Sequence, residues 1–124
     1  MNKFDKPYIV IPTIDENKIN ELFQLVTELD THKLLNYSRS EHIPLYSYNS
    51  KGESLIHEVI KINDNKASEH AKLNVIKFLV QNDVNYTSYN KDNKTPLHIA
   101  CIRQLHDIIS YLLSCGADPN YKDN

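Results

Sequence analysis

An internal repeat is the feature that most constrains the fold of this 124-residue chain. Residues 75–83 (VIKFLVQND) align with residues 108–116 (IISYLLSCG) at an offset of 33 without a gap, and their apolar positions coincide. Residues 52–59 align with residues 93–100 at an offset of 41, so the first unit carries eight additional residues, which we place in the polar stretch 63–68. A period of this length predicts a stack of similar units, each burying its apolar face against its neighbours.

The local chemistry of the second unit predicts a pair of helices. Thr95 is a favourable N-cap, and Pro96 at the first helical position loses only an amide that has no partner there. A second apolar helix follows, and Gly116 supplies a C-terminal stop that can adopt a positive φ. Three residues share one face of the first helix at helical spacing: Leu97, Ala100 and Cys101.

Two motifs of this unit stand at a fixed separation: residues 92–100 (DNKTPLHIA) and residues 112–120 (LLSCGADPN). Together they resemble the TPLH and GAD-x-N signatures of an ankyrin repeat. Residues 49–89 resemble a diverged copy, with residues 54–57 (SLIH) in place of TPLH and residues 83–85 (DVN) in place of GAD. The resemblance covers residues 48–124, of which the last five begin a further repeat. It implies an all-α, ankyrin-type helix-turn-helix solenoid with extended turn fingers, acting as a non-catalytic protein–protein interaction module, or adaptor.

Residues 1–47 lack these signatures and form the first of two parts, residues 48–124 being the second. Residues 13–16 (TIDE) have the form of a capping box, and a second short helix is expected over residues 31–37. We interpret this segment as a degenerate helix pair that caps the stack with a polar outer face, preceded by an extended arm at residues 9–11 that packs across the first helices. The first helix carries one apolar stripe, formed by Ile19, Leu22, Phe23, Val26 and Leu29.

Charge and composition disfavour several classes of function. The net charge is −2, with 5 basic against 7 acidic residues in 1–47 and 9 against 9 in 48–124, so the basic excess of a nucleic-acid binder or polybasic membrane clamp is missing. No apolar run approaches the ~18 residues of a membrane span, and the N-terminus has no apolar core of a secretory signal. Two cysteines without metal or redox spacing, in a chain with no export signal, indicate a reducing intracellular compartment, the cytoplasm.

The sequence offers no catalytic residue, metal site or cofactor site. His57 and His98 share one repeat position, whose imidazole, by the resemblance, links its own turn to a neighbouring turn. His57-Glu58 does not begin a zinc-protease motif because the position four residues after His57 is Lys61. Two glycines are too few for a phosphate-binding loop, and Cys101, expected to be buried, has no neighbours that would activate a thiol. An enzyme is therefore not expected.

The candidate partner-binding surface comprises the turn tips and the inner helices of the solenoid. By the resemblance, positions that flank the framework face partners: Tyr48, Ser50, Lys51, Glu53, Lys61 and Ile62 in the first unit, and Tyr89, Lys91, Asp92, Lys94, Ile102 and Arg103 in the second. All of these except Ser50 and Lys61 are our candidate binding residues. The candidate framework residues are His57, Thr95, Pro96, Leu97, His98 and Gly116.

The composition of this surface favours a protein as the partner, rather than a nucleic acid, a membrane or a small molecule. Tyrosine and arginine are enriched at interface hot spots because they bury area and retain a polar tip. Tyr48 and Tyr89 are candidates for such contacts, whereas Tyr46 and Tyr86 are expected to pack turn against turn. The lysines of the tips are more typical of a solvated edge than of a phosphate site.

An alternative function uses the other surfaces of the stack. The apolar helix over residues 108–113 has a neighbour on one side only, and unmatched apolar surface of this kind is typical of an interaction site. The chain would then be a structural subunit, or a fragment of a larger assembly or of a longer ankyrin protein, for example a viral or host-directed one. It would make contact through this open C-terminal face and the N-terminal arm. A third possibility is an accessory domain of an enzyme.

Overall fold

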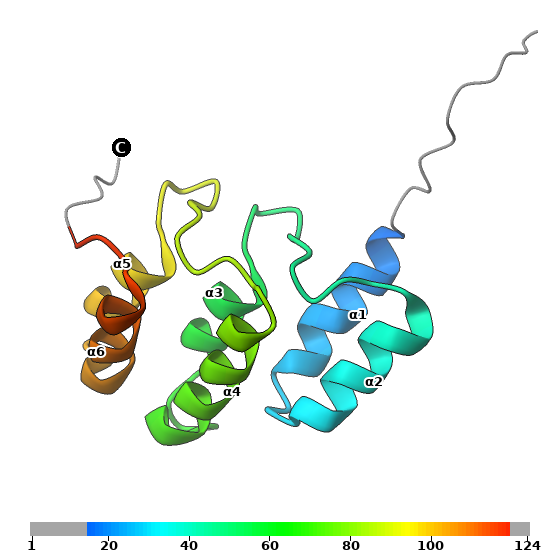
Figure 1. Cartoon of the computed structure of the whole chain (residues 1–124), viewed down its shortest axis with the longest axis horizontal. Coiled ribbons are helices and arrows are strands. Elements are labelled where there is room, and N and C mark those ends of the chain that lie inside the picture. Colours follow the sequence, from blue (N-terminus) through cyan, green and yellow to red (C-terminus); the bar gives the residue numbers. More distant parts are fainter. Residues whose placement is uncertain (1–14, 120–124) are drawn as a thin grey trace, which may run out of the picture.

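The computed structural model describes residues 15–119, which form six helices arranged in three pairs, with no strand among them (Figure 1). The pairs stand side by side in a row, and the loops that link one pair to the next project from one edge of the row. This all-α helix-turn-helix stack is the architecture expected from the repeat. Each helix pair is one unit, and the N-terminal pair is counted as the first, so the two repeats recognised in the sequence are the second and third units of the stack. The helices are α1 (Glu16–Val26), α2 (Thr31–Glu41), α3 (Leu55–Lys61), α4 (Glu69–Gln81), α5 (Pro96–Ile102) and α6 (His106–Cys115).

The helices pack in two rows. Within each pair the two helices contact each other. Between pairs, α3 contacts both α1 and α5, so α1, α3 and α5 form the inner row, and α4 contacts α6 in the outer row. A single apolar core runs along the stack between the rows, because each pair contributes residues with almost no exposed surface. Its most buried members include Leu22 and Val26 of α1, Leu34 of α2, Leu55, Ile56, Val59 and Ile60 of α3, Ile76 and Leu79 of α4, Ala100 of α5, and Ile108 and Leu112 of α6.

Side-chain caps set where the helices begin. Ser54 and Thr95 cap α3 and α5 through capping boxes, and Pro96 occupies the first turn of α5. The first helix begins after Asp15, whose side chain accepts a hydrogen bond from the Asn17 amide at 2.9 Å. The expected cap, Thr13, and the expected arm at residues 9–11 lie outside the described residues. The second helix extends to Glu41, beyond the predicted end at residue 37.

The outer helix α6 is capped by the neighbouring unit. Its own N-cap residue, Leu105, provides no side-chain hydrogen bond. Instead the carboxylate of Glu69, at the start of α4, accepts hydrogen bonds from the amides of Asp107 and Ile108 at 2.8 and 3.0 Å. This carboxylate satisfies two amides that a helix N-terminus leaves unpaired, and it complements the positive end of the helix dipole. The cap therefore also joins the second and third units.

The eight additional residues lie between α3 and the aligned part of α4, as the alignment predicted, but only part of them is loop. Four of them, residues 69–72, add a first turn to α4, and the other four lengthen the connection, which spans residues 62–68 here and residues 103–105 between α5 and α6. The connection is fastened by Lys72 of α4, a lysine with no exposed surface. The Lys72 ammonium donates hydrogen bonds to the carbonyl oxygen of Ile62 and to the carboxylate of Asp64. Because a buried ammonium requires partners, these two bonds fix the path of the insertion.

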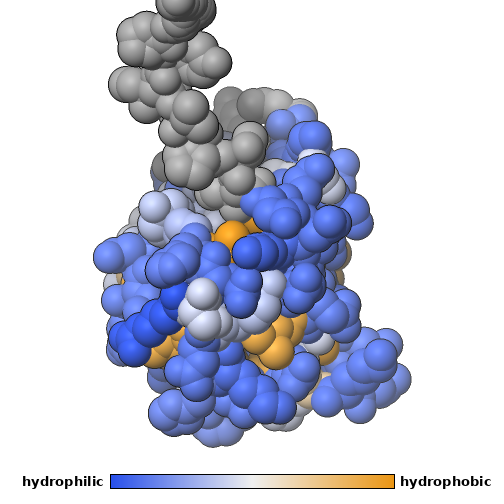
Figure 2. Space-filling view, turned by 90° about the vertical axis from the view of Figure 1, so that its right-hand side faces the viewer, coloured by the Kyte–Doolittle hydropathy of each residue, from blue (hydrophilic) through white to orange (hydrophobic). Residues whose placement is uncertain are grey.

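The two ends of the stack differ. At the end formed by α1 and α2, polar side chains surround small apolar patches (Figure 2). At the other end, Cys101 is exposed rather than buried, so the prediction of a buried small residue at this position is wrong. The equivalent residue of the second unit, Ile60, is completely buried. The physical reason is the position of the units: α3 has a neighbour on each side, whereas among the described residues α5 has a neighbouring inner helix on one side only.

Candidate partner-binding surface

Two loops carry the candidate binding residues, and we call them the first finger (residues 43–54) and the second finger (residues 83–95). Each finger turns around an asparagine. The side-chain oxygen of Asn49 accepts hydrogen bonds from the amides of Lys51 and Glu53, at 3.0 and 2.9 Å. The side-chain oxygen of Asn90 accepts in the same way from Asp92 and Lys94, at 2.9 and 3.0 Å. The two fingers therefore repeat one turn structure at the offset of 41 residues.

The same turn requires a left-handed backbone at one position. Gly52 has φ +73° in the first finger, and its counterpart Asn93 has φ +60° in the second. Glycine and asparagine are the residues that adopt this conformation most readily. The pair Gly52 and Asn93 therefore carries out the same backbone role, although the residue differs between the two units.

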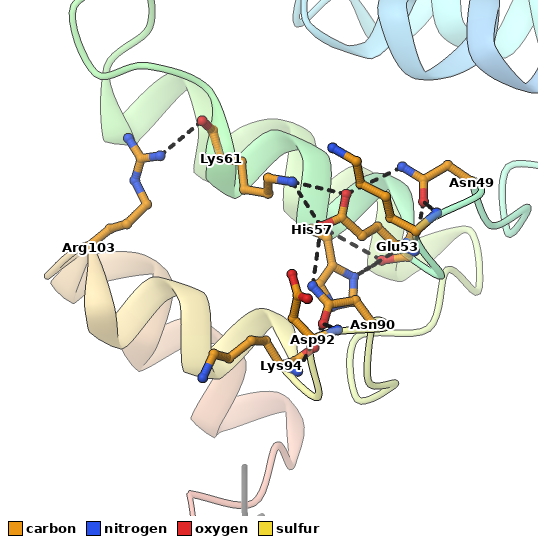
Figure 3. Close-up of polar contacts among 10 residues, drawn as sticks. Asn49, Glu53, His57, Lys61, Asn90, Asp92, Lys94 and Arg103 are labelled. Atoms are coloured by element: carbon orange, nitrogen blue, oxygen red, sulfur yellow. Dashed lines mark hydrogen bonds and ion pairs between the residues drawn. The ribbon is translucent and has the colours of Figure 1, made fainter. Parts of the chain in front are cut away.

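Neighbouring fingers are joined by hydrogen bonds that cross from unit to unit. The amide of Lys91 donates to the carbonyl oxygen of Lys51 at 2.9 Å. His57 provides the second link: its Nδ1 accepts from the Ser54 amide at 3.1 Å, so its proton lies on Nε2, which donates to the carbonyl oxygen of Lys94 at 3.0 Å (Figure 3). Burial lowers the pKa of His57 below its usual value, so the neutral imidazole is the form that makes these bonds. The two fingers are thus held in one fixed relation.

Glu53 belongs to this framework and is not an accessible binding residue, which corrects the prediction made from its register. Its side chain is only 3% exposed. Its carboxylate accepts hydrogen bonds from Lys61 at 2.8 and 3.0 Å, from Asn49 at 3.3 Å and from Asn90 at 3.2 Å (Figure 3). Burial on its own would raise the pKa of Glu53, but the hydrogen bonds and the charge of Lys61 outweigh it and hold that pKa below its usual value. A buried, fully paired carboxylate ties the fingers to α3.

A shallow groove lies between the second and third units on the finger side. It has a volume of roughly 250 Å³ and is lined by Glu53, Lys61, Asn90, Asp92, Lys94, Ile99, Ile102 and Arg103. Ile102 is 66% exposed, the highest value of the large apolar side chains described. Half-buried Ile99 lies one helical turn before it, so the two isoleucines form an apolar strip along α5. The groove therefore combines an apolar wall with a charged rim.

Arg103 and Ile62 are partly committed to contacts within the chain. The Arg103 guanidinium donates to the carbonyl oxygens of Lys61 and Ile62, at 2.9 and 3.2 Å, and lies 3.5 Å from the carboxylate of Asp64. It thus satisfies carbonyl groups at the C-terminal end of α3, where a cation is favourable. The side chain of Arg103 retains 27% exposure, so it lines the groove while also fastening α5 to α3. Ile62 is half-buried and packs against the core.

The tyrosines differ in what they do. Tyr48 and Tyr89 are 43% and 39% exposed; the Tyr48 hydroxyl accepts a hydrogen bond from Asn85 at 3.4 Å, and the Tyr89 ring lies 6.1 Å from the ring of His98. Tyr86 packs into the stack and donates to the carbonyl oxygen of Cys115 at 2.6 Å, in agreement with the prediction. Tyr46 is 58% exposed, so the prediction that its ring packs between turns is wrong.

The remaining predicted residues divide between rim and framework. Lys51, Lys91 and Asp92 are exposed at the finger tips, and Lys94 is half-buried beside them. His98 accepts from the Thr95 amide at 3.0 Å, as His57 does from Ser54. Leu97 is buried in the core, and Gly116 has φ +113° at the end of α6.

Sequence reasoning missed three residues of this surface: Asn49, Asn90 and Ile99. A signal for the two asparagines was present, because they recur at the offset of 41 residues that relates the fingers. The groove position of Ile99 had no comparable signal, since its counterpart in the second unit is Glu58. Burial raises the pKa of that half-buried carboxylate above its usual value.

Within residues 15–119 the structure contains no group of three or more histidine, cysteine or acidic side chains placed to hold a metal ion. None of the six helices has both the length and the apolar character that a membrane crossing requires.

Comparison with protein families identifies the repeat. A family model described as ankyrin repeats (3 copies) matches residues 22–123, from the middle of α1 to beyond α6. The number of repeat copies in that family model equals the number of helix pairs in the described part of the structure. No curated protein matches the chain.

Proposed function

The chain belongs to the ankyrin repeat family, and from this premise we propose that it is a non-catalytic adaptor that binds another protein on its concave surface. Ankyrin repeats are generally protein–protein interaction modules and typically not enzymes. The proposed surface consists of the two finger tips and of the groove along α3 and α5. Its candidate contact residues are Tyr48, Lys51, Tyr89, Lys91, Asp92, Lys94 and Ile102, with Arg103 at the edge of the groove.

The exposed apolar strip on α5 is the observation that carries this proposal. Two thirds of the Ile102 side chain is accessible, although it lines a groove rather than a convex surface. An apolar side chain in a concave, polar-rimmed position offers a partner area that becomes fully desolvated on binding, which is the arrangement typical of hot spots. Tyr48 and Tyr89 add exposed aromatic surface on the two fingers.

Preorganisation of the fingers supports the same proposal. The bonds from Lys91 to Lys51, from His57 to Lys94 and from Asn90 to Glu53 fix the neighbouring fingers before any partner arrives. A surface that is ordered beforehand loses less conformational entropy on association, so more of the contact energy remains as affinity. We propose that the partner is a folded or extended protein segment rather than a nucleic acid, a membrane or a small molecule, and that binding requires no cofactor. The compartment we propose is the cytoplasm, on the basis of the free thiols Cys101 and Cys115.

The test is partner binding by the full chain and by one apolar-to-acid variant. A partner is isolated on the immobilised chain, and its affinity is then measured for the natural protein and for Ile102→Asp. We expect Ile102→Asp to weaken binding by at least about tenfold, because it replaces the apolar contact by a charged carboxylate that must lose its water when the partner binds. The thermal midpoint should change little, since Ile102 is largely exposed and contributes little to the core.

Leu113→Asp is the matched control. Leu113 is also an exposed apolar residue, at 41%, but it lies on α6 and away from the groove. The proposal predicts that Leu113→Asp leaves the affinity for this partner unchanged. Loss of binding in Leu113→Asp with full binding in Ile102→Asp would show that the partner uses another surface and would refute the concave-surface proposal.

A further inference from the structure

The concave surface differs in charge from the rest of the chain. Besides the groove beside α5, it includes a second groove of roughly 250 Å³ between the first and second units, whose lining includes Gln24, Glu58, Lys61 and Lys66. The finger tips (residues 48–53 and 89–94) and the linings of the two grooves together carry six cationic side chains against three acidic ones, whereas the remaining residues carry eight against thirteen. The cations are Lys51, Lys61, Lys66, Lys91, Lys94 and Arg103, and the acids are Glu53, Glu58 and Asp92.

Two of the three acidic groups present little negative charge to a partner. Glu53 is only 3% exposed, and its carboxylate is bonded to Lys61. Glu58 is half-buried, and burial raises its pKa above the usual value. Of the three acids only Asp92 is exposed, whereas three of the six cations are lysines with exposed side chains that make no ion pair with either buried acid: Lys51, Lys66 and Lys91. The outward-facing charge of this surface is therefore positive, although the chain as a whole is negative.

Two of these cations are held next to each other by the framework of the fingers. The backbones of Lys51 and Lys91 are joined by a hydrogen bond of 2.9 Å from the Lys91 amide to the Lys51 carbonyl oxygen. Both side chains are exposed at the tips, so the two ammonium groups stay within reach of one ligand segment whichever way they turn. Like charges in this arrangement repel each other, and an anionic group from outside relieves that repulsion.

Cationic side chains also surround the apolar strip of α5. Lys94 precedes the start of this helix, Arg103 follows its end, and Lys61 lies on α3 across the groove (Figure 3). The half-buried Ile99 and the exposed Ile102 lie between them. An apolar side chain that binds here therefore has cations of the chain on more than one side.

From this arrangement we infer that the partner segment is acidic: an extended stretch that seats an apolar side chain against Ile102 and places aspartate or glutamate side chains against Lys51 and Lys91. The inference rests on the proposed function, because it specifies the ligand chemistry of the same surface. Complementary charge speeds association and selects against basic partners, which this surface repels. The phosphates of a nucleic acid would also meet the lysines, but they would leave the apolar strip without a contact.

The experiment selects ligands from a displayed library of random peptides of about twelve residues, long enough when extended to cross from one unit to the next. The full chain is the immobilised target, and counter-selection on Ile102→Asp removes every peptide that does not require the groove. We expect the retained peptides to be enriched in aspartate and glutamate by at least about twofold over the library, next to an aliphatic or aromatic residue.

A retained peptide is then titrated against two double variants. Lys51→Glu with Lys91→Glu should weaken its binding by at least about tenfold, because the tips would repel the carboxylates of the peptide. The matched control is Lys33→Glu with Lys77→Glu, which changes the net charge equally at exposed positions of α2 and α4 and should leave the affinity unchanged. A second measurement needs no variant: binding to the natural chain should weaken severalfold when salt is raised, because exposed charges are screened.

The outcomes separate this inference from the proposed function. Retained peptides without acidic enrichment, or with an affinity that neither salt nor Lys51→Glu with Lys91→Glu lowers, would overturn the inference and leave the concave-surface proposal standing. A selection in which no peptide depends on Ile102 would refute the concave-surface proposal and this inference with it. An oligothymidylate of the same length that binds more tightly than the selected peptide, and displaces it, would make a nucleic acid the occupant and overturn the inference.

Discussion

Replacement of His57 by alanine tests the link between the fingers most severely. The imidazole is completely buried; its Nδ1 accepts a hydrogen bond from the Ser54 amide within its own unit, and its Nε2 donates to the Lys94 carbonyl oxygen of the next finger. His57→Ala removes both partners at once and leaves a space of the size of the ring. Water has little access to the orphaned Ser54 amide because Ser54 is also completely buried, whereas Lys94 is half-buried.

The expected loss of stability can be worked from these contacts. An unpaired buried amide or carbonyl costs about 1 kcal/mol or more, and the cavity left by the ring adds about 1 kcal/mol. We therefore expect the free energy of unfolding to fall by about 3 kcal/mol, a large share of the 5–15 kcal/mol typical of a domain. The matched variant His98→Ala should cost about 1–2 kcal/mol, because His98 is only half-buried although it caps α5 in the same way.

Urea unfolding of both variants, followed by far-ultraviolet circular dichroism, measures the two values. An unchanged slope with denaturant would show that the comparison reports stability rather than a change in the unfolded state. The reasoning would be refuted if His57→Ala cost less than about 0.5 kcal/mol, or if His98→Ala cost as much as His57→Ala.

Three further predictions follow from other contacts. Burial lowers the pKa of His57, so the imidazole takes up a proton more readily in the unfolded chain than in the folded one. The contribution of His57 to the free energy of unfolding should therefore be full above about pH 6.5 and fall at lower pH by up to about 1.4 kcal/mol per pH unit. Between pH 7.5 and pH 5.5, the urea midpoint should fall less in His57→Ala than in the natural chain. Glu69→Gln should lower the free energy of unfolding by about 1 kcal/mol, because the neutral amide oxygen is a weaker cap for α6 than the carboxylate. Hydrogen exchange should then be faster at the start of α6, and a loss of protection confined to α4 would contradict this reasoning. Lys72→Ala should cost about 3 kcal/mol, since the buried stem and the bond to Ile62 are both lost; urea unfolding without a measurable change would show that this lysine does not fasten the insertion.

The helices and their order could be predicted because they rest on local chemistry that repeats along the chain. Thr95 and Pro96 mark the start of α5, Gly116 marks the end of α6, and the two offsets place the additional residues between α3 and the aligned part of α4, although they do not show that four of them extend α4. The N-cap of α6 could not be predicted in this way. Its carboxylate comes from Glu69, which is distant in sequence and approaches only when the units stack.

The candidate surface was predictable at the level of register but not of individual contacts. Register shows which side of a unit a residue faces, and on that basis Lys51, Lys91 and Asp92 were expected at the finger tips, where they lie. It does not show which side chains pair with one another, so Glu53, which is buried by its bonds to Lys61 and Asn90, was taken for a contact residue.

The same limitation explains Cys101. Its apolar surroundings in sequence indicate burial, and within the helix it follows the buried Ala100. Burial at this position, however, depends on the unit that comes next, as the buried counterpart Ile60 shows. A pattern within one unit cannot report the presence of a neighbour.

The concave-surface proposal is tested most directly by amide hydrogen exchange of the full chain, alone and saturated with its isolated partner. The proposal predicts slower exchange in the complex at residues 48–53, at residues 89–94 and along α5, with no change in the outer helices α4 and α6. Protection confined to α2, α4 or α6, with unchanged exchange in both fingers and α5, would contradict it.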